Sequence, residues 1–148
     1  MKAPMPELMV TDMQASIEFY QKALGFELTF SIPDPDGNIV HASLQNGDSM
    51  IMLSPCTDRL KAAEGPLGKG VTLYFPLHED EDVDALFTRA EAAGANVLQT
   101  PVDEFWGDRI WSVADPDGYQ ITIAKQVREV SMDEMQKAVE AMSVAAPA

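Results

Sequence analysis

His41 is one of two histidines in this 148-residue chain, and it lies in the alternating segment IVHASL. Imidazole can act as a general acid or base near neutral pH, because its unperturbed pKa is about 6.5. A histidine on a half-buried strand more often serves as a hydrogen-bond partner, so a catalytic and a binding role both stay open. The second histidine, His78, precedes the acidic run EDED, which has donors for a metal ion but is also typical of a solvated helix start.

Other reactive groups give weaker signals. Cys56 follows a proline in a turn-rich connector and has no activating base beside it in the sequence, so a nucleophilic role is not expected. The glycine-rich segment 65–70 lacks the spacing of a phosphate loop and is interpreted as a hinge. Trp106, Asp108 and Arg109 in EFWGDR are candidates for the mouth of a cleft. The simpler alternative is a loop held by an Arg–Asp contact and a buried indole.

Composition narrows the class of partner. The net charge of −14, from 24 acidic and 10 basic residues, repels nucleic-acid phosphates and anionic lipid. It can attract a cationic small molecule, or simply keep the protein in solution. No apolar run is long enough to span a membrane, and MKAPMPELMV has no apolar core of a secretory signal. With a single cysteine, these features predict a cytoplasmic protein without nucleic-acid or membrane partners.

An internal repeat positions these side chains. Asp12 caps a helix that begins at Met13, and Gly25 and Gly94, which are 69 residues apart, each end a helix. One predicted strand precedes each helix and three follow it, which predicts an α+β fold of two tandem strand–helix–three-strand modules. Neither half can bury its sheet alone, so the modules must share a core or pair with another chain. The predicted strands are 7–11, 26–32, 39–44, 49–54, 71–77, 95–102, 109–114 and 119–125.

The C-terminal segment follows a different pattern. Ser131 and Glu134 form a capping box, and the helix after it is expected to reach about Met142. Its apolar stripe could close over the chain's own sheet or dock on a partner subunit; the stripe comprises Met132, Met135, Val139 and Met142. The predicted organisation is therefore a domain over 1–126, with modules at about 5–55 and 70–126, and a helical tail over 127–148.

The two modules resemble the vicinal oxygen chelate superfamily, which includes glyoxalase I, bleomycin-resistance proteins and extradiol dioxygenases. The resemblance covers about residues 5–126, and FWGDRIWSVADPDG with VSMDEMQKA is similar to its PhnB-like branch. It implies that the modules curve as a mixed sheet around a cleft, and that the protein forms a homodimer. The first-module motif consists of Val10, Asp12, Ser16, Phe19, Tyr20, Leu24 and Gly25, and DPDGYQITI closes the second module.

The same resemblance places the superfamily's metal ligands at Met5, Met52, Val71 and Thr122. Divalent metals of these enzymes need imidazole or carboxylate donors. Two thioethers, an alkyl group and a hydroxyl do not supply them. The sequence therefore predicts no metal and no cofactor at this site.

Turn chemistry predicts which residues line the cleft. A two-residue turn at Asn46-Gly47 pairs His41 with Met52 and Ser43 with Met50, so all four share a face. A two-residue turn at Pro116-Asp117 pairs Trp111 with Thr122 and Arg109 with Ala124. The predicted pocket has one wall from each module and Trp106 at its mouth; its walls are His41, Ser43, Met50 and Met52, opposite Arg109, Trp111 and Thr122.

Three functions are compatible with this pocket. The first is metal-free binding of a small aromatic or cationic molecule, with drug sequestration as the attractive version, since methionine and aromatic walls suit a flat apolar ligand. The second is a lyase, isomerase or dioxygenase-type enzyme that uses His41 or a displaced metal site. The third is a structural or protein-interaction role of the methionine-rich C-terminal helix.

Overall fold

The computed structural model describes residues 1–61 and 65–145. Within them, two four-stranded sheets are ordered β1-β4-β3-β2 and β5-β8-β7-β6. The first pair in each order is parallel and the other neighbours are antiparallel. The strands are β1 (Glu7–Val10), β2 (Glu27–Pro33), β3 (Ile39–Asn46), β4 (Ser49–Pro55), β5 (Thr72–Pro76), β6 (Asn96–Asp103), β7 (Asp108–Ala114) and β8 (Gln120–Gln126).

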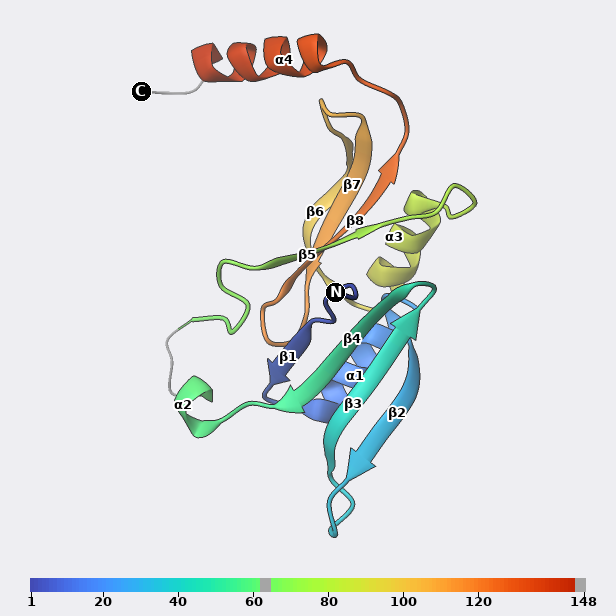
Figure 1. The fold of residues 1–148 in the computed structure, drawn as a ribbon, viewed down its shortest axis with the longest axis vertical. Coiled ribbons are helices and arrows are strands. Elements are labelled where there is room, and N and C mark those ends of the chain that lie inside the picture. The colour runs from blue at the N-terminus through green and yellow to red at the C-terminus, as the bar shows by residue number, and fades with distance from the viewer. Residues whose placement is uncertain (62–64, 146–148) are drawn as a thin grey trace.

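The helices complete the repeat, so the predicted α+β fold of two tandem modules is confirmed. Each module has its own hydrogen-bonded sheet, and the two lie one beyond the other along the molecule's long axis (Figure 1). None of the described helices combines the length and apolar character needed to cross a membrane. The helices are α1 (Met13–Lys22), α2 (Asp58–Lys61), α3 (Val83–Ala92) and α4 (Met132–Ala145).

Local sequence signals explain the ends of both module helices. Asp12 accepts from the Ala15 N–H at 2.9 Å, and Asp82 accepts from the N–H groups of Asp84 and Ala85. These bonds satisfy backbone donors that the first turn leaves free. Gly25 and Gly94 then adopt φ of 72° and 78°, a region that favours glycine and ends the helix.

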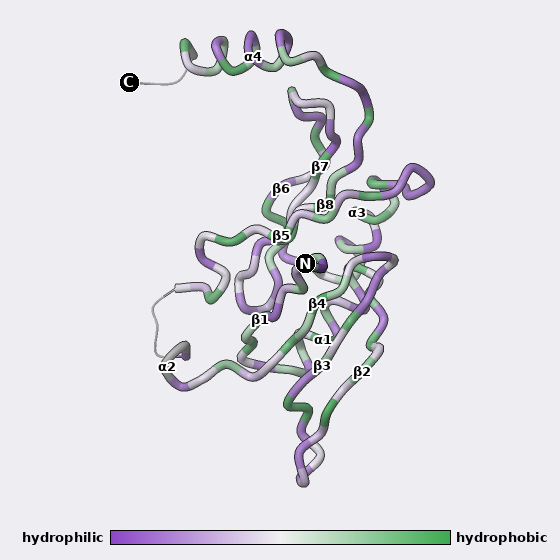
Figure 2. Tube along the Cα trace, viewed as in Figure 1, coloured by the Kyte–Doolittle hydropathy of each residue, from purple (hydrophilic) through white to green (hydrophobic). Residues whose placement is uncertain are grey.

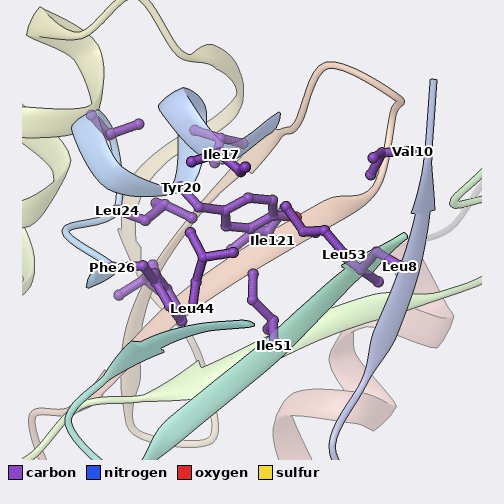
Figure 3. Close-up of a cluster of buried hydrophobic side chains, with 14 of the residues drawn as sticks. Leu8, Val10, Ile17, Tyr20, Leu24, Phe26, Leu44, Ile51, Leu53 and Ile121 are labelled. Atoms are coloured by element: carbon purple, nitrogen blue, oxygen red, sulfur yellow. The ribbon is translucent and has the colours of Figure 1, made fainter. Parts of the chain in front are cut away.

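The two modules share one hydrophobic core. Along the strands of both sheets hydrophobic and hydrophilic residues are mixed (Figure 2). The buried apolar side chains of both modules belong to a single cluster, part of which is drawn in Figure 3. Phe26 of the first module meets Phe75 of the second edge to face, with ring centroids 5.7 Å apart. The C-terminal ends of α1 and α3 are also joined, because the Arg89 guanidinium of α3 donates to the carbonyls of Gln21 and Lys22 in α1. Neither module therefore buries its apolar face independently of the other.

A buried polar contact also joins the modules. The Tyr20 hydroxyl of α1 donates to Asp115 Oδ2 at 2.9 Å, and the other carboxylate oxygen accepts from the N–H groups of Asp117 and Tyr119. Burial raises the pKa of Asp115 above its usual range, although these donors act in the opposite direction. Burial beside this carboxylate also raises the pKa of Tyr20 far above that of a free phenol.

The raised pKa of Asp115 predicts a pH dependence. The folded state holds this proton more tightly than the unfolded chain, so the group's contribution to stability is largest at low pH. It declines as pH rises from the ordinary aspartate range, about 3.9, through the raised pKa, and is constant above it. We expect the free energy of unfolding of the wild type, relative to Asp115→Asn, to fall with pH across that window. Urea titrations at a series of pH values measure it, and a rising difference would contradict the assignment.

The β3–β4 register differs from the predicted one by an even step. Asn46 belongs to the strand, where it pairs with Ser49, and its side-chain amide donates to the Leu24 carbonyl. The turn is Gly47-Asp48 in place of Asn46-Gly47, and Ser43 pairs with Met52. Since side chains alternate with a period of two, an even displacement leaves each one on its predicted face.

The β7–β8 register differs from the predicted one by a single residue, so the predicted pairing is wrong. Asp115 and Tyr119 close a three-residue loop with Gly118 at φ 84°, a common hairpin geometry with glycine in the left-handed region. Trp111 pairs with Ile123, and Thr122 pairs with Ser112. Trp111 and Arg109 therefore lie on the opposite face of the sheet from Thr122.

The C-terminal helix forms as its capping box predicts. The Ser131 Oγ accepts from the Glu134 N–H, and Glu134 Oε2 accepts from the Ser131 N–H. α4 stands away from both sheets (Figure 1), so it does not close over the chain's own sheet. Much of its methionine stripe is exposed. The short helix α2 (Asp58–Lys61) in the connector was not predicted.

Candidate functional site

The face of the first sheet that points away from α1, here called open face 1, carries the predicted first wall. Side chains on the opposite, core-facing side of the same strands are buried, whereas those on open face 1 are partly exposed. It also holds Phe30, which is 55% exposed, and Ile32, both on β2. A bulge between Leu28 and Phe30 interrupts the alternation along β2, so the sequence pattern did not indicate that Phe30 and Ile32 share a face with His41. The predicted residues on this face are His41, Ser43, Met50 and Met52.

Three polar side chains on adjacent strands form a hydrogen-bonded chain on open face 1. Ser54 Oγ of β4 donates to Glu7 Oε1 of β1 at 2.6 Å. His41 Nδ1 of β3 lies 3.3 Å from the same Ser54 oxygen and 4.0 Å from Glu7 Oε1. Phe30 contacts the imidazole, with ring centroids 6.3 Å apart. Sequence reasoning found His41 but missed Glu7 and Ser54, although strand alternation places Ser54 on the same face as Met52.

The corresponding face of the second sheet, open face 2, presents a different group. Asp108 Oδ2 accepts from the Tyr74 hydroxyl at 2.8 Å and from the Trp106 indole N–H at 3.1 Å. Tyr74 is 46% exposed, and partial burial with the Asp108 contact raises its pKa to about 12. Tyr74 therefore stays protonated as a hydrogen-bond donor. Sequence reasoning missed Tyr74. Trp106 lies in a turn and donates to Asp108, and its place at the mouth of a cleft stays a prediction.

Thr122 lies on open face 2 but is only 4% exposed. Its hydroxyl is 2.8 Å from that of Ser112 on the neighbouring strand. The two hydroxyls satisfy one another in a buried setting. The threonine at the superfamily's metal position is thus part of a cross-strand hydrogen bond.

Trp111 and Arg109 do not join the predicted second wall. Trp111 is fully buried, packs on Phe87 of α3, and donates its indole N–H to the Val83 carbonyl at 2.8 Å. Arg109 binds the carboxylates of Asp84 and Asp103 on the helix side of the sheet. These bonds raise the pKa of the guanidinium. The alternative of a loop held by its own Arg–Asp contact and a buried indole is also not what the structure shows. Arg109 binds Asp84 and Asp103, Asp108 accepts from Trp106, and the fully buried indole is that of Trp111.

The metal positions implied by the resemblance are dispersed over both modules. Met5 and Val71 are exposed and precede β1 and β5, while Met52 and Thr122 lie within β4 and β8. Across residues 1–61 and 65–145, no three His, Cys, Asp or Glu side chains form a group able to hold a metal ion. The absence of a functional metal stays a prediction.

The acidic segment at His78 is organised around a lysine. Lys125 Nζ donates to the carbonyls of His78, Glu79 and Glu81. Glu81 in turn accepts from the His78 backbone N–H. An ammonium group thus binds the loop's carbonyl oxygens, which supports the interpretation of this run as a helix start.

Two hollows lie where the modules meet. One, of about 260 Å³, is lined mainly by helix-side apolar residues such as Phe26, Phe75 and Leu86. The other is an open groove of about 300 Å³ that places Met50 of the first module near Tyr74 of the second. His41 lines neither hollow. Within the described chain, the imidazole therefore lies on an open sheet face.

Comparison with known proteins gives three kinds of similarity. The model of the glyoxalase/bleomycin resistance protein/dioxygenase superfamily matches residues 3–123. The uncharacterized protein Rv0887c of Mycobacterium tuberculosis is 37% identical over 139 residues, covering 90% of this chain and 80% of that protein. YraH of Bacillus subtilis is 28% identical over 135 residues, covering 86% and 100%.

Two solved structures resemble the fold. TioX from Micromonospora sp. ML1 superposes with a TM-score of 0.69 at 26% identity, covering 84% of this chain and 99% of that one. TnmS3, an antibiotic binding protein from Streptomyces sp. CB03234, gives a TM-score of 0.64 at 23% identity, covering 85% and 96%.

Proposed function

Because this chain belongs to the glyoxalase/bleomycin resistance protein/dioxygenase superfamily, we propose that it binds a small aromatic or cationic molecule without a metal ion. Open face 1 carries the proposal. It exposes Phe30 and Ile32 beside Met50, Met52 and His41, a combination of apolar surface and one polar group that suits a flat ligand. TnmS3, whose fold is similar, is an antibiotic binding protein. This similarity supports drug sequestration as the biological role of such binding.

We further propose that a second copy of the chain completes the cleft. The two sheets of one chain lie one beyond the other, and His41 lines neither hollow between them. Exposed aromatic side chains on both open faces would become buried if open face 1 of one copy met open face 2 of another. The opposing wall would then be Tyr74, Trp106 and Asp108, which replace Trp111 and Arg109. The PhnB-like motifs and the single cysteine are compatible with this dimer acting in the cytoplasm.

Binding is tested by a thermal-shift screen of aromatic and cationic compounds, since a ligand that prefers the folded state raises the melting temperature. We expect Phe30→Ala to remove the shift caused by a hit while changing the ligand-free stability little, because the side chain is exposed. Val127→Ala, at an exposed residue outside both sheets, is the matched control. A hit whose shift survives Phe30→Ala would contradict binding at open face 1. Stoichiometric metal in the purified protein would contradict the metal-free reading.

The composite cleft has a sharper test. Light scattering should give about twice the 16.2 kDa chain mass, and a monomer would contradict the dimer. Phe30→Ala and Trp106→Ala should each abolish binding alone. Mixing them by unfolding and refolding should restore it in part, because each heterodimer has one cleft with both substitutions and one with neither. No restoration would place both residues in the same chain's site.

A second candidate function is an enzyme that uses His41 for acid–base chemistry, such as a lyase or isomerase. The contact of its imidazole with Ser54, which donates in turn to Glu7, favours this alternative, because catalytic bases are commonly oriented by a further polar group. His41→Ala would then abolish turnover of a bound compound while leaving its affinity largely intact.

A further inference from the structure

The chain of Glu7, Ser54 and His41 on open face 1 has a defined direction. A carboxylate can only accept hydrogen bonds, whereas a hydroxyl has one hydrogen and two acceptor lone pairs. The Ser54 Oγ to Glu7 Oε1 distance of 2.6 Å is that of a short hydroxyl–carboxylate bond. The single hydrogen of Ser54 is therefore committed to Glu7.

This direction determines the proton position on His41. Its Nδ1 lies 3.3 Å from Ser54 Oγ, which has only lone pairs left to offer. The contact is a hydrogen bond only if Nδ1 carries the hydrogen. Glu7 Oε1, 4.0 Å from Nδ1, adds attraction for the same N–H. In the neutral ring, Nε2 is then without a hydrogen and can only accept.

We propose that Glu7 and Ser54 hold neutral His41 in its Nδ1–H tautomer and so make Nε2 a fixed acceptor on open face 1. No hydrogen bond from Nε2 to another described residue is present in the structure. The exposed Phe30 ring stands beside the imidazole. The ligand class that fits both features is an aromatic molecule bearing an O–H or N–H donor, such as a phenol or an aryl amine. This ligand class rests on the function proposed above, whereas the tautomer does not.

The tautomer is measured on the ligand-free protein. Long-range proton–nitrogen correlation spectra of the imidazoles, recorded above the pH range in which histidine titrates, distinguish a protonated ring nitrogen from a bare one. His78→Gln assigns the two histidines. We expect protonated Nδ1 and bare Nε2 for His41; the reverse pattern would overturn the proposal.

Two serines on the same face provide a matched pair. Ser54→Ala removes the acceptor of Nδ1–H, so the Nε2–H tautomer should gain population. Ser43→Ala removes a hydroxyl that forms no described bond with His41, so the spectrum should keep the wild-type pattern. Equal spectra for wild type and Ser54→Ala would show that Ser54 does not position the ring.

Phenol and anisole then test the acceptor role, since they differ in the O–H donor. Phenol should shift the His41 Nε2 resonance, and anisole at the same concentration should not. An unchanged Nε2 in the presence of bound phenol would overturn the acceptor role. Failure of both to bind, together with the expected tautomer, would instead contradict this ligand class and count against the proposed binding function.

Discussion

Trp111→Ala should lower the free energy of unfolding by about 3–5 kcal/mol, the usual cost of removing a large buried aromatic side chain. Trp111 is fully buried, packs on Phe87 with ring centroids 5.6 Å apart, and donates to the Val83 carbonyl. The substitution leaves a cavity between β7 and α3 and removes the indole hydrogen bond to the first turn of that helix. Urea denaturation followed by circular dichroism measures the loss.

Trp106→Ala is the matched control, because it removes the other indole of the chain. Trp106 lies in a partly exposed loop and donates one hydrogen bond to Asp108, so its loss should cost about 1 kcal/mol. The same substitution should abolish ligand binding under the proposed function. The two tryptophans thus separate stability from binding, and a larger stability loss for Trp106→Ala would contradict their placement.

Tyr20→Phe should destabilise the protein by about 1.5–3 kcal/mol, because it removes a hydrogen bond to a buried carboxylate. The ring still fills its place between Phe19 and Phe26, so little packing is lost. What changes is that Asp115 Oδ2 loses its donor in a buried setting. Since the two residues belong to different modules, the loss also weakens the contact between them.

Tyr119→Phe provides the comparison for this bond. The Tyr119 hydroxyl also links the modules, but it donates to the neutral Met9 carbonyl at 2.9 Å in a partly buried place. Its removal should cost about 1 kcal/mol. Urea denaturation of both variants at neutral pH gives the two losses, and an equal or larger effect of Tyr119→Phe would show that the Tyr20–Asp115 bond is not the stronger link.

The elements of this fold could be predicted because their signals are local. Asp12 and the Ser131–Glu134 pair act on backbone groups within one helical turn, and alternation along a strand separates the two faces of a sheet. The repeat then fixed the order of elements. The short helix α2 had no comparable signal, since a single turn carries little periodicity.

The candidate site was predicted in part, and the difference lies in two turns. His41, Ser43, Met50 and Met52 lie on the predicted face because the first hairpin moved by an even step. Trp111 was misplaced because a third residue in the Asp115–Tyr119 loop moved the second hairpin by one. A register change of one residue moves every side chain of a strand to the other face of the sheet. The two-residue turn therefore predicted Trp111 in a ligand-binding wall, whereas the three-residue loop places it in the core.

The amino-acid sequence by itself determined the repeated modules, their helix ends and one face of the first sheet, because these depend on short-range periodicity and capping. Only the tertiary structure brought Glu7, Ser54 and His41 together from three strands, and Tyr74, Trp106 and Asp108 from two separated segments. It also joined the modules through Tyr20 and Asp115, which are 95 residues apart. Such contacts depend on strand order and on how two sheets pack, which the alternation along a single strand does not encode.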